Sequence, residues 1–137
     1  MPVSLTIPLT PEEPERLPEN PRRALQAAFY DWLRTGDAEL AGRVHDADGP
    51  KPFTISDLFR RRDSEDFWWR VTLLQDGLVR PLARGLGYVT HVDLLGYAVP
   101  IRHQAVDLQG QSYVDLARQA RADTRFEMRF ISPTSFR

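Results

Sequence analysis

The chain has 137 residues, 42% of them hydrophobic and 27% charged, with a net charge of −1 at pH 7 and no cysteine. This length fits one domain that buries about two-thirds of its unfolded surface. The absence of cysteine excludes disulfides and thiolate metal sites, and the net charge gives no overall positive field that would attract nucleic acid. No signal peptide or membrane span is visible in the sequence, so we expect a cytoplasmic protein with no membrane partner.

The first predicted elements are a strand and a long helix. Apolar and polar side chains alternate over residues 3–9, which predicts a strand, and a connector rich in Pro and Glu follows. Asn20-Pro21 predicts a helix start, because Asn caps well and Pro at the first helical position loses no hydrogen bond. Gly36 can end this helix. Its apolar stripe comprises Leu25, Ala28, Phe29, Trp32 and Leu33.

Three chemically active side chains surround a second, shorter helix. Tyr30 lies off the apolar stripe, on the polar flank of the first helix. Asp37 can cap the short helix, whose C-terminal end carries His45, where the helix dipole favours a protonated ring. Lys51 is the only lysine in the chain, and it lies between an Asp-Gly-Pro turn and a predicted strand over 53–56.

Tyrosine, histidine and lysine are suited to cleave RNA through its own 2′-hydroxyl without a metal. Histidine generally titrates near ~6.5 and can act as acid or base, whereas tyrosine, near ~10, orients a hydroxyl unless its pKa falls. Lysine supplies a compact ammonium for a phosphate oxygen. His91 and His103 have no ligand-like spacing with each other or with His45, so we expect no metal site.

The middle of the chain continues the alternation of strands and helices. Arg60, Arg61 and Arg62 form the densest basic cluster, either a solvated loop or a phosphate clamp, before a strong strand over 67–73. Within that strand, Trp68 and Trp69 are interpreted as core and interface residues rather than base-stacking platforms. Asp76-Gly77 opens a helix that we expect Gly85 and Gly87 to end.

The last predicted elements complete a known fold and then extend beyond it. The stretch 91–101 reads as a bent fourth strand, so the order is βαββαβ. This order predicts an α+β, ferredoxin-like, RRM-like domain, with an antiparallel sheet and helices on one face. Ser112 with Asp115 resembles a capping box that opens another helix, and a final strand carries Phe126, Met128 and Phe130.

The spacing of the three active side chains carries a family resemblance. Tyr30 in the first helix, His45 fifteen residues on and Lys51 six residues beyond precede a Phe-Thr strand. These features resemble the N-terminal half of the CRISPR-associated endoribonucleases that process precursor CRISPR RNA, members of the RAMP superfamily. The flanking matches are LQAAFY, ELAGRVH and GPKPFTIS, and near the C-terminus FEMRFISPTSF.

The resemblance implies metal-independent cleavage within CRISPR repeat RNA, without a cofactor, leaving a 2′,3′-cyclic phosphate and a 5′-hydroxyl. It assigns His45 as the acid, Tyr30 as the base or orienting group, and Lys51 as the transition-state cation; the reverse assignment of Tyr30 and His45 stays open. It also implies effector-complex proteins as partners, and either a monomer or a homodimer. The expected RNA-binding residues are Arg22, Arg23, Arg60, Arg61 and Arg62.

Family members continue into a second, similar domain with a glycine-rich loop that contacts RNA. We therefore expect residues 1–137 to form one ferredoxin-like domain that lacks this second half, with 112–137 bridging toward it. Two alternatives remain open. One is a module of the same superfamily that binds RNA or a partner without cutting. The other is a structural half that exposes an apolar patch where its partner domain packs.

Overall fold

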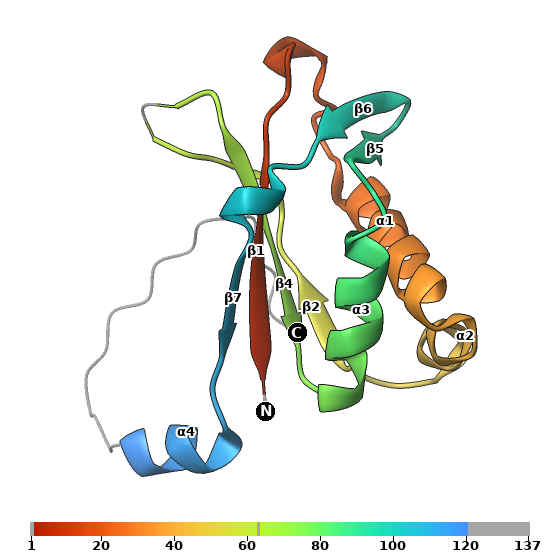
Figure 1. Ribbon diagram of the computed structural model, residues 1–137, viewed down its shortest axis with the longest axis vertical. Coiled ribbons are helices and arrows are strands. Elements are labelled where there is room, and N and C mark those ends of the chain that lie inside the picture. The colour runs from red at the N-terminus through yellow and green to blue at the C-terminus, as the bar shows by residue number, and fades with distance from the viewer. Residues whose placement is uncertain (1, 63, 121–137) are drawn as a thin grey trace.

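The computed structural model describes residues 2–62 and 64–120 of the chain (Figure 1). Its main sheet is antiparallel, in the order β2-β4-β1-β7, and a short strand, β3, pairs with β4. The strands are β1 (Val3–Leu9), β2 (Phe53–Ile55), β3 (Phe59–Arg60), β4 (Phe67–Leu73) and β7 (Asp107–Gly110). With two helical crossovers this is the ferredoxin-like βαββαβ arrangement, as the sequence predicts.

Helices α1 (Arg22–Gly36) and α3 (Val79–Leu86) cover one face of this sheet, and α2 (Ala38–Asp46) packs beside α1 (Figure 1). Short 3-10 turns occupy Pro14–Arg16, Asp76–Leu78 and His103–Ala105. The predicted alternation in β1 and β4 is confirmed, because every second side chain points into the core. The buried core includes Leu5, Ile7, Phe29, Leu33, Trp69, Val71 and Leu82.

The predicted bent strand over 91–101 is wrong. This stretch forms a hairpin of β5 (His91–Leu94) and β6 (Tyr97–Pro100), which make a separate two-stranded sheet. Leu95 and Gly96 turn the chain with φ values of 56° and 89°, and two consecutive positive φ values are typical of a tight hairpin turn. The fourth strand of the main sheet is instead β7, whose side chains are all exposed, so it shows no alternating pattern.

Glycines set how closely α1 and α3 approach. Gly36 ends α1 as predicted, but Gly85 lies inside α3 rather than at its end, and Gly87 is the cap. A Cβ on Gly85 would overlap the main-chain carbonyl oxygen of Trp32, and one on Gly36 would overlap that of Pro81. Gly85 is therefore a contact point between helices, which its position near a helix end concealed in the sequence.

The caps of the shorter helices follow the sequence. The Asp37 side chain accepts a hydrogen bond from the Leu40 N–H at the start of α2, and Ser112 does so from Asp115 at the start of α4 (Tyr113–Gln119). The predicted final strand, the FEMRFISPTSF motif and most of the stretch expected to bridge to a second domain lie outside the described residues. Over the ranges 2–62 and 64–120, no helix has the length and apolar character needed to cross a membrane.

Candidate active site

Helix α2 folds back against α1 and brings Tyr30 into contact with His45. Their ring centroids lie 5.1 Å apart with an interplanar angle of 71°, an edge-to-face arrangement. Tyr30 also meets the ring of Phe53, from β2, at 5.6 Å. Only 7% of Tyr30 is exposed. The flank of α1 that carries Tyr30, interpreted from the sequence as polar, is therefore partly covered, and Ala41 and Val44 of α2 belong to the same buried core.

The burial of Tyr30 has a chemical consequence. Removal from water disfavours the charged tyrosinate, so burial raises the pKa of Tyr30. The phenol consequently keeps its proton at neutral pH and is able to donate a hydrogen bond. Of the two roles that the sequence left open for Tyr30, the raised pKa favours orienting a hydroxyl over acting as the base.

His45 occupies the C-terminal end of α2, as the sequence predicts. Its side chain is 64% exposed, so the ring is accessible to a large ligand such as RNA. The ring nitrogen Nδ1 lies 3.1 Å from Oδ1 of Asp46. When Nδ1 carries the proton it donates to this carboxylate, which leaves Nε2 for proton exchange with a substrate. Asp46 was not predicted from the sequence, because its only signal there is its place directly after His45.

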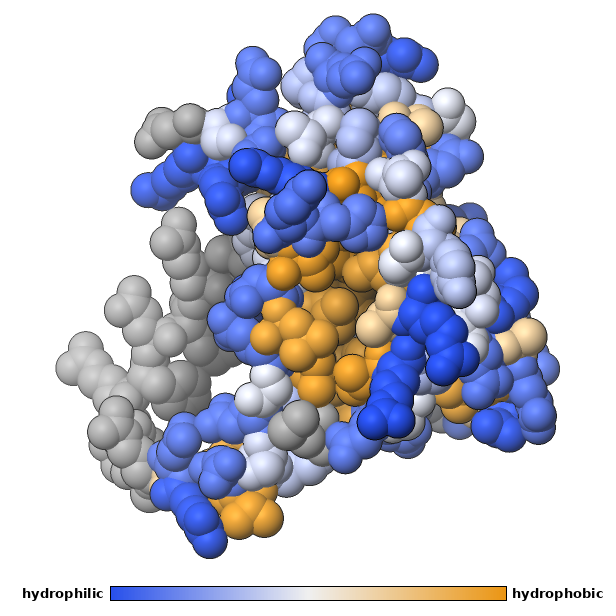
Figure 2. Space-filling model, in the orientation of Figure 1, coloured by the Kyte–Doolittle hydropathy of each residue, from blue (hydrophilic) through white to orange (hydrophobic). Residues whose placement is uncertain are grey.

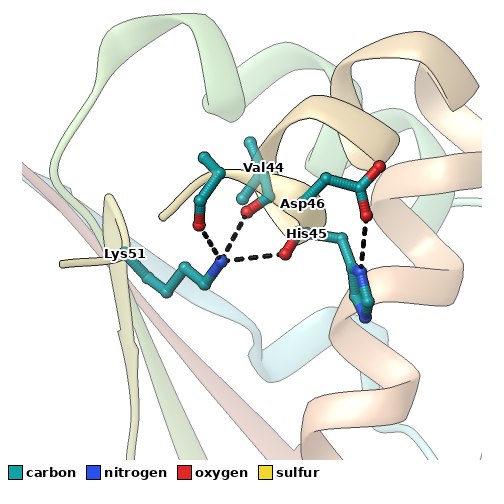
Figure 3. A network of polar contacts seen from close by, with 5 residues as sticks. Val44, His45, Asp46 and Lys51 are labelled. Carbon is teal, nitrogen blue, oxygen red and sulfur yellow. Dashed lines mark hydrogen bonds and ion pairs between the residues drawn. The ribbon is translucent and has the colours of Figure 1, made fainter. Parts of the chain in front are cut away.

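Lys51 lies just before β2, and its side chain reaches back to the end of α2 (Figure 3). Its Nζ donates to three main-chain carbonyl oxygens, those of Val44 at 3.0 Å, His45 at 2.9 Å and Ala47 at 2.7 Å. Carbonyls at a helix C-terminus have no intrahelical partners and attract cations. The structure thus places the Lys51 ammonium against the backbone of His45, with all three of its protons engaged.

Replacement of Lys51 by methionine is expected to lower the free energy of unfolding by about 1–2 kcal/mol, because the last carbonyls of α2 lose their cationic cap. Urea unfolding would measure the loss. Arg80→Met is the control, since this exposed arginine lies in the first turn of α3, where a cation gains nothing from the dipole. Equal stability of Lys51→Met and the wild type would contradict a capping role.

The five predicted RNA-binding arginines lie at two places. Arg22 and Arg23 are exposed in the first turn of α1, and Arg22 forms an ion pair with Asp57 at 3.5 Å. Arg60, Arg61 and Arg62 line a shallow depression at the tip of the β3–β4 hairpin. That hairpin and α2 lie at opposite ends of the molecule (Figure 1). The structure therefore does not bring the arginine cluster to Tyr30 and His45.

Comparison with known proteins shows a structural likeness to solved Cas6 proteins. No protein-family model and no curated protein sequence matches the chain. Among solved structures, one Cas6 product complex matches 77% of the chain with a TM-score of 0.65 at 26% identity. A second Cas6 product complex matches 81% with a TM-score of 0.57 at 30% identity. A Cas6-related protein from Pyrococcus furiosus matches 82% with a TM-score of 0.67 at 11% identity, which shows the shared fold alone.

The chain spans only part of each of these proteins, namely 40%, 41% and 49% of their lengths. By structure, the chain is therefore a Cas6-like domain that corresponds to about half of the CRISPR-associated Cas6 proteins it matches.

Proposed function

We propose that this domain carries the catalytic residues of a metal-independent endoribonuclease that cleaves the repeats of precursor CRISPR RNA into guide RNAs. The observation that carries the proposal is the contact between the buried Tyr30 ring and the exposed His45 ring at the end of α2, within a Cas6-like domain. Likeness to Cas6 proteins solved as product complexes supports an RNA substrate.

The reaction is a displacement at phosphorus. The 2′-oxygen attacks, the bond from phosphorus to the 5′-oxygen breaks, and the products are a 2′,3′-cyclic phosphate and a 5′-hydroxyl. His45 protonates the leaving 5′-oxygen as general acid. Tyr30, held protonated by burial, orients the 2′-hydroxyl, whose proton passes to solvent. In this scheme no metal or cofactor takes part.

Lys51 has two roles in this proposal. Its bonds to the carbonyls of Val44, His45 and Ala47 fix the end of α2 and hence the position of His45. During the reaction the ammonium exchanges one carbonyl for a phosphate oxygen and stabilises the charge that develops there. Because all three protons are engaged in the free protein, the same geometry favours a second candidate function, a module that binds RNA without cutting it.

A second domain, like the unmatched half of the Cas6 structures, completes the RNA site in our proposal. Exposed apolar side chains available for such packing are Leu108 on β7 and Val114 and Leu116 on α4. Figure 2 shows apolar surface over α4 and, separately, between the sheet and α3. The arginines of α1 and of the β3–β4 hairpin contact the RNA backbone. We place the protein in the cytoplasm, with repeat RNA and effector-complex proteins as partners.

The test is cleavage of a labelled repeat RNA in EDTA, by the chain alone and by the product of its complete open reading frame. We expect cleavage to leave a cyclic phosphate and to stop when the scissile nucleotide lacks its 2′-hydroxyl. A requirement for Mg²⁺, or a product with a 3′-hydroxyl, would refute the mechanism. Tight binding of the repeat by the complete protein without any cleavage would establish the binding module instead.

A further inference from the structure

The face of the main sheet opposite α1 and α3 carries an aromatic cluster that the catalytic proposal does not use. In β4, Trp69, Val71 and Leu73 are buried against the helices, so Trp68 and Arg70 point to the opposite face. Phe59 of β3 pairs directly with Trp68 across the ladder and so shares that face. Of the two tryptophans interpreted as core and interface residues, Trp69 lies in the core. Trp68 lies outside the core, on the opposite face of the sheet.

The members of this cluster contact one another closely. The ring centroids of Phe59 and Trp68 lie 4.7 Å apart with an interplanar angle of 36°. The guanidinium carbon of Arg70 lies 5.4 Å from the centroid of the Trp68 ring, within cation–π range. Phe59 and Trp68 are half-buried and, within the described residues, neither packs against the hydrophobic core. Core packing therefore does not account for a tryptophan and a phenylalanine at these positions.

The surroundings of the cluster select the chemistry of its ligand. Arg61 and Arg62 lie exposed at the tip of the same hairpin, whereas Arg60 pairs with Phe67 and holds its guanidinium over the Phe67 ring, on the other face of the ladder. Of the acidic residues described there, Asp66 is paired with Arg102 at 3.2 Å, and Glu65 lines the depression beside the arginines. An aromatic pair with the Arg70 guanidinium over one ring, and two further exposed arginines on the same hairpin, match the two parts of a single-stranded nucleic acid, its bases and its phosphates. An apolar protein partner would offer no negative charge to pair with the arginines.

We propose that Phe59, Trp68 and Arg70 bind single-stranded RNA by base stacking, while Arg61 and Arg62 contact its phosphates. Bases stack on aromatic rings and on guanidinium planes, and related four-stranded sheets use aromatic residues on their open face in this way. The β3–β4 hairpin that carries Phe59 lies on the other side of the molecule from α2 (Figure 1). The stacking site therefore holds a segment of RNA remote from the cleavage site, and it does not depend on whether His45 cuts.

Tryptophan fluorescence can report RNA binding at Trp68 selectively. Of the three tryptophans, Trp32 and Trp69 are 3% and 0% exposed, so an RNA that stacks on the protein surface quenches Trp68. We expect a single-stranded oligouridylate of about ten nucleotides to quench the emission, and a blunt RNA duplex of the same length to do so far less. Emission that stays constant while the labelled strand becomes bound would overturn the proposal.

Variants then separate stacking from folding. Trp68→Leu and Phe59→Leu should each weaken binding of the labelled oligouridylate about ten-fold by fluorescence anisotropy, whereas Trp68→Tyr, which keeps a ring, should retain most of it. Tyr88→Leu is the matched control, since it removes an aromatic side chain that is 75% exposed outside the sheet. Circular dichroism verifies that each variant is folded. Wild-type affinity in folded Trp68→Leu or Phe59→Leu protein would overturn the proposal, whatever the outcome of the cleavage assay.

Discussion

Gly85→Ala is expected to lower the free energy of unfolding by about 3 kcal/mol, because a methyl group at this position has no space. The added Cβ would overlap the carbonyl oxygen of Trp32, and this neighbour is main chain, which cannot rotate away as a side chain can. The only relief is a shift of α3 away from α1, which opens the core around Leu33 and Leu82. Urea or thermal unfolding measures the loss.

Gly42→Ala is the matched control for this substitution. Gly42 also lies inside a helix, α2, but it is exposed and a Cβ there would meet nothing within 4 Å. Alanine in a helix interior is favoured over glycine, so this variant should gain about 0.5–1 kcal/mol. Both variants receive the same gain in helix propensity, and their difference therefore measures packing alone. Equal stabilities for the two variants would show that α1 and α3 do not touch at Gly85.

The sequence predicted those elements whose pattern is local. Alternation over Val3–Leu9 and Phe67–Leu73 comes from one buried face, and caps such as Asp37 act on N–H groups three residues away. The prediction failed where the decisive contact lies far along the chain. The strand β7 is an exposed edge with no apolar alternation of its own, and only its pairing with β1 makes it the fourth strand. Gly85 likewise depends on a helix some fifty residues earlier.

The candidate site shows the same division. The sequence correctly placed His45 at the end of a short helix, since the Asp37 cap and the apolar spacing fix that helix. It could not show that α2 covers Tyr30, because the burial of Tyr30 depends on the angle between two helices. Nor could it show that the ammonium of Lys51 turns toward carbonyls rather than toward open solvent. Both features change the chemistry, since one keeps the phenol protonated and the other gives Lys51 a structural task.

His45→Ala is expected to reduce the single-turnover rate of repeat cleavage by a factor of about 10²–10⁴, because a positioned general acid usually contributes this factor to the rate. Affinity for the repeat should change little, because the proposal places the binding groups on arginines and on the sheet. The fold should persist, since the His45 side chain is 64% exposed and contributes little to the core. Rates measured with enzyme in excess isolate the chemical step from product release.

His91→Ala is the control for the loss of an imidazole. His91 is also exposed, and its Nδ1 lies 2.6 Å from the Thr90 hydroxyl, on the β5–β6 hairpin rather than on α2. Its removal should leave the rate unchanged. A substrate with a 5′-phosphorothiolate at the scissile position has a better leaving group, and its leaving sulfur needs no protonation. This substrate should therefore restore much of the cleavage rate of His45→Ala. It should not restore the rate of a variant with impaired RNA binding. Failure of this rescue would mean that His45 acts on the 2′-hydroxyl instead, which would reverse the roles of His45 and Tyr30.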